Sequence, residues 1–133
     1  TLLQAGFMPV ISPVCWGTAA DKAGLLNVNA DEVAAEIAIA IRASSLIYLT
    51  DVPGILDAGG KVMAHVAAGD VERLINAEVI RGGMIPKART CMRASYHVAR
   101  TRIIDGTAAH ALLHEDDIQP GGTTIDTEEL ARS

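Results

Sequence analysis

The segment LIYLT, at residues 46–50, constrains the fold more than any other part of the sequence. It is apolar up to Thr50 without alternating polar positions, as in a strand that is buried on both faces. Such strands belong to parallel sheets, in which helices form the connections and cover the faces. Strong helical periodicity flanks the segment at residues 30–43 and 85–99. The sequence therefore predicts an α/β fold.

The other elements follow from periodicity and turn-forming residues. The first long helix repeats Val33, Ile37 and Ile41 every four residues, and the second has Pro86 in its first turn, where proline is tolerated. Alternating strands and helices predict a three-layer α/β/α sandwich with an open, mainly parallel sheet. The shorter expected elements are a helix end at 1–5, strands at 7–12, 25–28 and 102–105, an extended piece at 62–66, helices at 71–78 and 109–113, and a glycine turn into a last strand at 120–125.

Composition and charge exclude two classes of partner. The net charge is −5 and the basic residues are scattered, whereas nucleic-acid binders usually carry a basic stripe. No apolar run approaches the roughly 18 residues of a membrane span, and no signal segment is present. Cys15 and Cys91 form no pairing motif, which is typical of reduced cytosolic thiols. We therefore expect a cytoplasmic protein without nucleic-acid or membrane partners.

The first residues predict that the chain starts inside a larger fold. TLLQAGF has no initial methionine, and it has the pattern of a last helical turn, capped by Gly6, that leads into a strand. We therefore expect a chain that is truncated at its N-terminus.

Asn27, Asn29 and Asp31 occupy alternate positions just before the first long helix. One interpretation is local: Asn29 caps the helix, Glu32 completes a capping box, and Asp31 favours the helix dipole. The other interpretation is functional, because an extended segment puts Asn27 and Asn29 on one side, where their amides can donate to a carboxylate. Asp31 could then hold a lysine ammonium. The sequence leaves both interpretations open.

Lys87 lies in the first turn of the second long helix, where a positive charge costs roughly 0.3–1 kcal/mol. Pro86 and the pair Gly82-Gly83 fix how the chain enters this helix. A cation at a helix N-terminus forms an anion site, so Lys87 is a candidate for binding phosphate. The alternative is a lysine that points into solvent.

The segment TDVPGILD, at residues 50–57, follows the buried strand and is rich in turn-forming residues. It is either a simple proline–glycine turn or a nucleotide loop with Asp51 near the ribose or the phosphates. The sequence contains neither GxxxxGK[ST] nor GxGxxG. His110 and His114 stand four apart, but without HExxH or a cysteine cluster they predict no metal site.

Taken together, NVNADEVA, LTDVPGILD, GGMIPKARTC and IIDGTAAHALLHE resemble the acetylglutamate kinases of the amino acid kinase superfamily. The resemblance implies that residues 1–126 are the C-terminal, nucleotide-binding part of the kinase domain, followed by a frayed tail at 127–133. It also implies transfer of the ATP γ-phosphoryl group to the side-chain carboxylate of N-acetyl-L-glutamate, a step of arginine biosynthesis. The Mg²⁺ of this reaction is carried by ATP.

The resemblance assigns roles to individual residues. Lys87 matches the lysine that stabilises the transferring phosphoryl group, and Asp31 matches the aspartate that organises the catalytic lysines. Asn27 matches the asparagine that binds acetylglutamate, and Asn29 is a weaker match beside it. The predicted nucleotide-binding residues are Thr50, Asp51, Val52, Pro53, Gly54, Ile55, Leu56, Val79, Ile80, Arg81, Gly83 and Met84.

Three further expectations come from the resemblance. His110, Glu115 and Gly121 match the effector site of arginine-inhibited members, so feedback inhibition by arginine is a hypothesis. The complete protein is expected to be a homo-oligomer, either a dimer or a hexamer. This chain alone is expected to have little or no kinase activity, because the family's N-terminal half carries another lysine, a glycine-rich phosphate loop and a substrate-binding arginine.

Three alternatives remain open on the sequence. One is the acetylglutamate synthase, whose kinase-like domain can be purely regulatory. Another is an amino acid kinase that acts on aspartate, carbamate or uridylate. A third is a non-catalytic module that binds nucleotide or arginine. Asp31 and Lys87 argue against the first alternative, and NVNAD favours acetylglutamate over the substrates of the second.

Overall fold

The computed structural model describes residues 2–18, 24–114 and 121–127. Its elements are β1 (Val14–Gly17), β2 (Gly24–Asn27), α1 (Ala30–Ala40), β3 (Ser45–Thr50), β4 (His65–Ala67), η1 (Ala68–Asp70), α2 (Val71–Asn76), α3 (Met84–Ala94), β5 (Arg100–Asp105), η2 (Ala111–His114) and β6 (Thr123–Asp126).

Four strands form one sheet in the order β3-β5-β6-β4. β3 and β5 are parallel, with Tyr48 beside Ile103, and β4 is parallel to β6. β5 and β6 are antiparallel. The mainly parallel sheet predicted from LIYLT is therefore confirmed.

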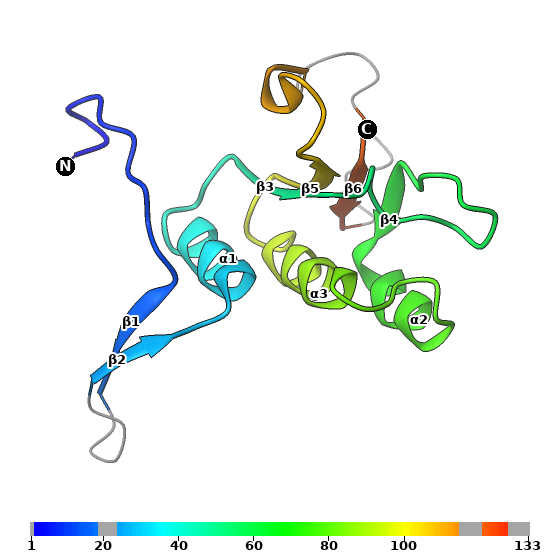
Figure 1. Ribbon diagram of the computed structural model, residues 1–133, viewed down its shortest axis with the longest axis horizontal. Helices are drawn as coiled ribbons and strands as arrows, with labels where there is room; N and C mark the ends of the chain where they lie inside the picture. Colours follow the sequence, from blue (N-terminus) through cyan, green and yellow to red (C-terminus); the bar gives the residue numbers. More distant parts are fainter. Residues whose placement is uncertain (1, 19–23, 115–120, 128–133) are drawn as a thin grey trace.

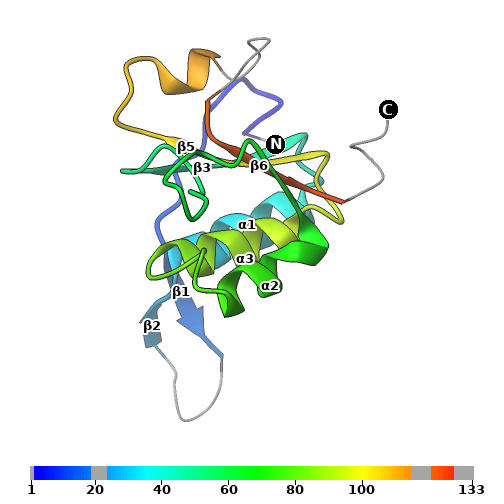
Figure 2. The ribbon, with the colours of Figure 1, turned by 90° about the vertical axis from the view of Figure 1, so that its right-hand side faces the viewer.

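The helices α1, α3 and α2 lie side by side against one face of this sheet, with α3 in the middle (Figure 1). Figure 2 shows the same layer from the side and places η2 on the opposite face. The α/β class is therefore confirmed. On that opposite face the described residues contribute η2 and loops, so Leu49 of β3 remains 48% exposed. Among the described residues, none of the helices has the length and apolar character that a membrane crossing requires.

Alanine forms much of the contact between the helices and the sheet. Ala35 and Ala38 of α1 and Ala88 and Ala94 of α3 are all at most 5% exposed. Small side chains let the helix backbones approach the strands closely, so a tight core forms with few aromatic residues. The buried strand residues that meet this layer include Tyr48, Ile103 and Ile125.

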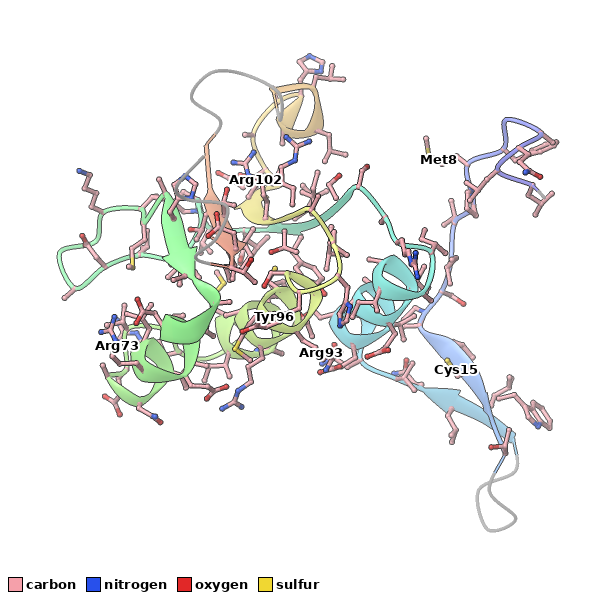
Figure 3. The ribbon with its side chains drawn as sticks, turned by 180° about the vertical axis from the view of Figure 1, so that it is seen from behind. Met8, Cys15, Arg73, Arg93, Tyr96 and Arg102 are labelled. Atoms are coloured by element: carbon pink, nitrogen blue, oxygen red, sulfur yellow. The ribbon has the colours of Figure 1, made fainter. Side chains whose placement is uncertain are left out.

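Residues 7–12 form no strand, which corrects the prediction. They run outside the sheet, and Met8 and Val10 are 89% and 96% exposed (Figure 3). Pro9 lacks the N–H that a sheet position needs, which disfavours pairing. The chain pairs later instead, because β1 and β2 form an antiparallel hairpin with Val14 beside Asn27.

The apolar stripe of α1 faces a groove rather than the sheet. Val33, Ile37 and Ile41 line this groove together with Pro9 and Ile11, and its volume is about 320 Å³. The stripe that predicted the helix thus packs towards the N-terminal segment, whereas the alanines beside it form the contact with the core.

Both long helices end earlier than predicted. In α1, Arg42 adopts the left-handed conformation (φ 51°), and the N–H of Ala43 donates to the carbonyl of Ala38, as in a Schellman motif. No glycine marks this end, so the sequence pattern extends beyond it. In α3, the Ser95 hydroxyl donates to the carbonyl of Met92 just past the last helical residue. The predicted helix at 109–113 is the 3₁₀ turn η2.

Candidate active site

The first turns of α1 and α3 bring two charged side chains together. Lys87 Nζ lies 3.1 Å from Asp31 Oδ2, and the two side chains are 22% and 17% exposed. Because α1 leads into β3 and α3 leads into β5, both first turns lie towards the carboxyl ends of these strands. Ligands of open α/β sheets bind at that end. The pair joins positions that are 56 residues apart in the sequence.

Asn29 forms the N-cap of α1. Its side-chain oxygen accepts the backbone N–H of Asp31 at 2.8 Å, which confirms the capping interpretation and fixes the turn that carries Asp31. Glu32 was expected to complete a capping box, but its carboxylate accepts a hydrogen bond from Arg93 instead. Asn27 is the last residue of β2, it is exposed, and two residues separate it from the helix start.

Arginines link the helices on the outer side of the layer. Arg93 of α3 contacts Glu32 at 2.6 Å and Glu36 at 3.0 Å, both in α1, and Figure 3 shows it between the two helices. The hydrogen bond to Glu32 raises the pKa of Arg93 above its usual value. Arg89 makes a similar link at 2.7 Å to Glu72 of α2. Both arginines therefore connect neighbouring helices while their side chains stay partly exposed to solvent.

Tyr48 lies beneath the charged pair, and sequence reasoning missed it. Its side chain is 6% exposed, and its hydroxyl donates to the backbone carbonyl of Asp31 at 2.6 Å. Burial raises the pKa of Tyr48 well above its usual value, so the hydroxyl stays protonated at neutral pH. The sequence offered one signal for this role: Tyr48 carries a hydroxyl within the apolar run at residues 46–49. A hydroxyl that is buried in such a strand needs a hydrogen-bond partner.

A cavity of about 610 Å³ lies between the loop after β3 and the segment that joins α2 to α3. This volume is in the usual range for small-molecule sites. The predicted nucleotide-binding residues that line it are Val52, Gly54, Ile55, Leu56, Val79, Arg81 and Met84. The other lining residues are Asp57, Ala58, Gly60, Ala77 and Glu78. Asp57 belongs to the segment predicted as a nucleotide loop, and sequence reasoning missed the other four. Met84 begins α3, so the cavity extends to the helix turn that carries Lys87.

Five predicted nucleotide-binding residues are not among those that line the cavity: Thr50, Asp51, Pro53, Ile80 and Gly83. Ile80 is 1% exposed and belongs to the hydrophobic core, which accounts for this apolar residue without a ligand. Thr50 ends β3, and its hydroxyl donates to the Asp51 carboxylate at 3.2 Å. Gly83 is the N-cap of α3, with no side chain to occupy the helix start.

The three predicted arginine-effector residues are not seen together. His110 is exposed in the turn before η2, in the left-handed conformation (φ 58°). The carbonyl of Gly121 accepts a hydrogen bond from the guanidinium of Arg102, a residue of this chain (Figure 3). Glu115 lies outside the described residues. Arginine binding at these positions remains a prediction.

The two cysteines have opposite environments. Cys15 of β1 is exposed, whereas Cys91 of α3 is fully buried. Burial is the main cause that raises the pKa of Cys91 to about 12, so it is a neutral thiol near pH 7. In the part of the chain that the structure describes, no group of three or more His, Cys, Asp or Glu residues is arranged to hold a metal ion.

Comparison with known proteins agrees with this geometry. The amino acid kinase family matches residues 1–105. The chain is similar to the acetylglutamate kinase of Aquifex aeolicus, with 45% identity over 130 residues that cover 96% of this chain and 43% of the relative. It is 39% identical over 135 residues to the acetylglutamate kinase of Dehalococcoides mccartyi, covering 99% of this chain and 50% of the relative. The chain therefore spans about half the length of these curated relatives.

Solved structures support the same fold. The N-acetylglutamate synthase of Neisseria gonorrhoeae, complexed with coenzyme A and L-arginine, is similar with a TM-score of 0.82 and 26% identity, over 96% of this chain and 29% of that chain. The carbamate kinase of Giardia lamblia bound to AMP-PNP shares the fold with a TM-score of 0.61 at 19% identity, over 79% of this chain and 35% of that chain. By its matching family, its fold and its relatives, the chain belongs to the amino acid kinase family.

Proposed function

We propose that this chain is the C-terminal, ATP-binding part of an acetylglutamate kinase. The complete enzyme would transfer the γ-phosphoryl group of ATP to the side-chain carboxylate of N-acetyl-L-glutamate, a step of arginine biosynthesis. The observation that carries the proposal is the Asp31–Lys87 pair, which lies at the starts of two adjacent helices beside a cavity of nucleotide size.

The chemistry needs charge neutralisation more than it needs a base. A carboxylate is already an ionised nucleophile, so the site must bring two anions together and hold the reacting oxygens in line. The Lys87 ammonium supplies positive charge where the γ-phosphoryl group would pass. Asp31 orients that ammonium through the 3.1 Å contact and abstracts no proton.

The cavity beside α3 is the proposed seat of ATP. Its lining combines apolar residues such as Val79 and Met84 with the charged side chain of Arg81. The phosphates would point to the N-terminus of α3, where the helix dipole and Lys87 both favour negative charge. Mg²⁺ typically keeps several waters and binds through substrate phosphates, so the ion is expected to arrive with ATP. When bound, the ion neutralises phosphate charge.

The amino acid substrate is assigned to the end of the hairpin. Asn27 ends β2 and Asn29 caps α1, so both lie next to the turn that carries Asp31. The side-chain oxygen of Asn29 is used in the cap, and the amide nitrogens of both residues are the groups suited to a substrate carboxylate. The similarity to two acetylglutamate kinases supports acetylglutamate as the substrate.

Three properties of the complete protein belong to the same proposal. It would work in the cytoplasm, assemble as a homo-oligomer, and respond to arginine as a feedback inhibitor. The similar synthase structure contains L-arginine, which supports the last of these.

A regulatory kinase-like domain is the second candidate, because the synthase structure aligns with a TM-score of 0.82. The two candidates make different predictions for the complete gene product. A kinase turns over ATP in the presence of acetylglutamate, whereas a synthase transfers an acetyl group from acetyl-coenzyme A to glutamate.

The experiment measures ATP turnover by the complete gene product with acetylglutamate, glutamate and aspartate, and acetyl transfer to glutamate in parallel. We expect turnover with acetylglutamate in clear preference to the other two acceptors. Turnover with aspartate alone, or acetyl transfer without ATP turnover, would overturn the proposal.

A further inference from the structure

Tyr48 lies beneath the charged pair, and the chemistry assigned above does not use its hydroxyl. It lies in the middle of β3, its ring points into the helix layer, and it is 6% exposed. A phenylalanine would fill the same apolar space without a buried hydroxyl. Because burying a hydroxyl is unfavourable unless it is hydrogen-bonded, the contacts of this oxygen indicate why a tyrosine stands here.

The Tyr48 hydroxyl contacts the turn that carries Asp31. It donates to the main-chain carbonyl of Asp31 at 2.6 Å, across 17 positions of sequence. Asn29 holds the same turn from its other side, by accepting the N–H of Asp31 at 2.8 Å. Both main-chain polar groups of Asp31 are therefore hydrogen-bonded, which limits the directions that its carboxylate can take.

The helix that carries Lys87 packs against the same strand, so both charged residues sit on elements that contact β3. Within α3, the Thr90 hydroxyl directs its hydrogen to the carbonyls of the first turn. The Thr90 hydroxyl lies 2.8 Å from the carbonyl of Pro86 and 3.0 Å from the carbonyl of Lys87. The single hydrogen of the Tyr48 hydroxyl is therefore directed at the first turn of α1, which carries Asp31.

We propose that Tyr48 is a positioning residue for phosphoryl transfer, which holds the first turn of α1 from β3 so that Asp31 stays paired with Lys87. The inference rests on the proposed kinase function. It adds a role for a residue that holds the Asp31–Lys87 pair in place. The strand is suited to this task, because β3 is hydrogen-bonded to β5 over its whole length. A side chain on a rigid strand places its tip more accurately than one on a loop.

The test compares Tyr48→Phe with Tyr96→Phe in the complete gene product. Both variants remove one phenolic hydroxyl, but Tyr96 is 64% exposed after the end of α3. For Tyr48→Phe we expect kcat to fall by about tenfold, as the loss of one well-placed hydrogen bond allows, while KM for ATP changes less than twofold. Tyr96→Phe should match the wild type in both constants.

A double-mutant cycle separates positioning from general packing. If Tyr48 acts through the pair, Tyr48→Phe should lower kcat no further in the Asp31→Asn background. A full additional tenfold loss in that background, or wild-type kcat in the single variant, would overturn the inference.

One measurement does not depend on activity. The coupling between Asp31 and Lys87 can be obtained from urea unfolding of Asp31→Asn, Lys87→Met and the double variant, with and without Tyr48→Phe. We expect the coupling to fall severalfold without the hydroxyl, and an unchanged coupling would overturn the positioning role. If the wild type shows no acetylglutamate-dependent turnover, the proposed function fails, while this coupling still decides what Tyr48 does.

Discussion

The backbone N–H of Ile55 donates to Thr123 Oγ1 at 2.8 Å, in the buried interior. This bond ties the loop after β3 to the first residue of β6, across 68 positions of sequence. The residues that line the nucleotide-sized cavity lie at 52–60 and 77–84, so β6 supports one wall of the cavity from behind.

Gly54 makes this close approach possible, and we expect Gly54→Ala to destabilise the protein by about 2–3 kcal/mol. Its φ is 145°, and an added Cβ would lie 2.7 Å from Thr123 Oγ1 and 3.2 Å from the backbone of Gly122. Because alanine disfavours this φ and its Cβ would lie too close to Thr123, the loop that carries residue 54 must shift. Urea unfolding measures the effect.

The matched control is Gly69→Ala, because Gly69 has no left-handed φ and an added Cβ there would meet nothing within 4 Å. It should change the free energy of unfolding by less than about 1 kcal/mol. Equal effects of the two substitutions would contradict the assigned role of Gly54.

Lys87→Ala should lower kcat of the complete enzyme by about 10²–10³-fold, because the proposed mechanism uses this positive charge to stabilise the transferring phosphoryl group. The fold should persist, since Lys87 is at the edge of the helix layer and remains 22% exposed. Steady-state kinetics together with circular dichroism check both statements. Lys61→Ala removes an exposed lysine from a loop and should retain wild-type kcat; parallel losses in the two variants would rule out a specific role for Lys87.

The cysteines should differ in reactivity and in their effect on pH stability. At pH 8, a thiol reagent should modify Cys15 rapidly in the folded protein and reach Cys91 only after unfolding. The pKa of Cys91 rises from 9.0 to about 12 on folding, so the unfolded chain releases its proton first as pH increases. The contribution of the neutral Cys91 thiol to the free energy of unfolding is therefore complete below pH 9. It is lost between pH 9 and 12, as the free energy of unfolding falls by about 1.4 kcal/mol per pH unit.

Cys91→Ala provides the control for this pH dependence. Unfolding free energies measured from pH 8 to 11 should fall less steeply in the variant than in the wild type. The same slope in both proteins would show that other groups determine the alkaline loss of stability.

Arginine should bind to the complete gene product and stabilise it against heat, and His110→Ala should weaken that binding by at least tenfold. The reason is that His110, Glu115 and Gly121 match the effector pattern of arginine-inhibited members of the family. Isothermal titration measures the affinity. His97→Ala changes another exposed histidine and serves as the control; unaltered binding in His110→Ala would remove the effector assignment.

Patterns that depend on local chain geometry could be predicted from the sequence. LIYLT predicted a parallel strand, and Asn29 was recognised as a helix cap. The approach of Asp31 to Lys87 is a long-range contact that the residues alone could not establish, although the resemblance placed both side chains in one site.

The failures have particular physical causes. The end of α1 was missed because Arg42, rather than glycine, adopts the left-handed conformation there. The strand predicted at 7–12 was wrong because apolar composition does not supply a neighbouring sheet edge. Tyr48 was counted as an apolar residue of its strand, and only coordinates reveal what its hydroxyl contacts.

The joint between the hairpin and α1 consists of Val28 and Asn29 alone. Because the connection is only two residues long, a displacement of the β1–β2 hairpin would also move Asn29, the N-cap of α1. In the proposed enzyme, an acceptor bound by Asn27 would therefore be connected to the turn that carries Asp31 through this dipeptide, so binding of the acceptor and placement of the carboxylate would be coupled.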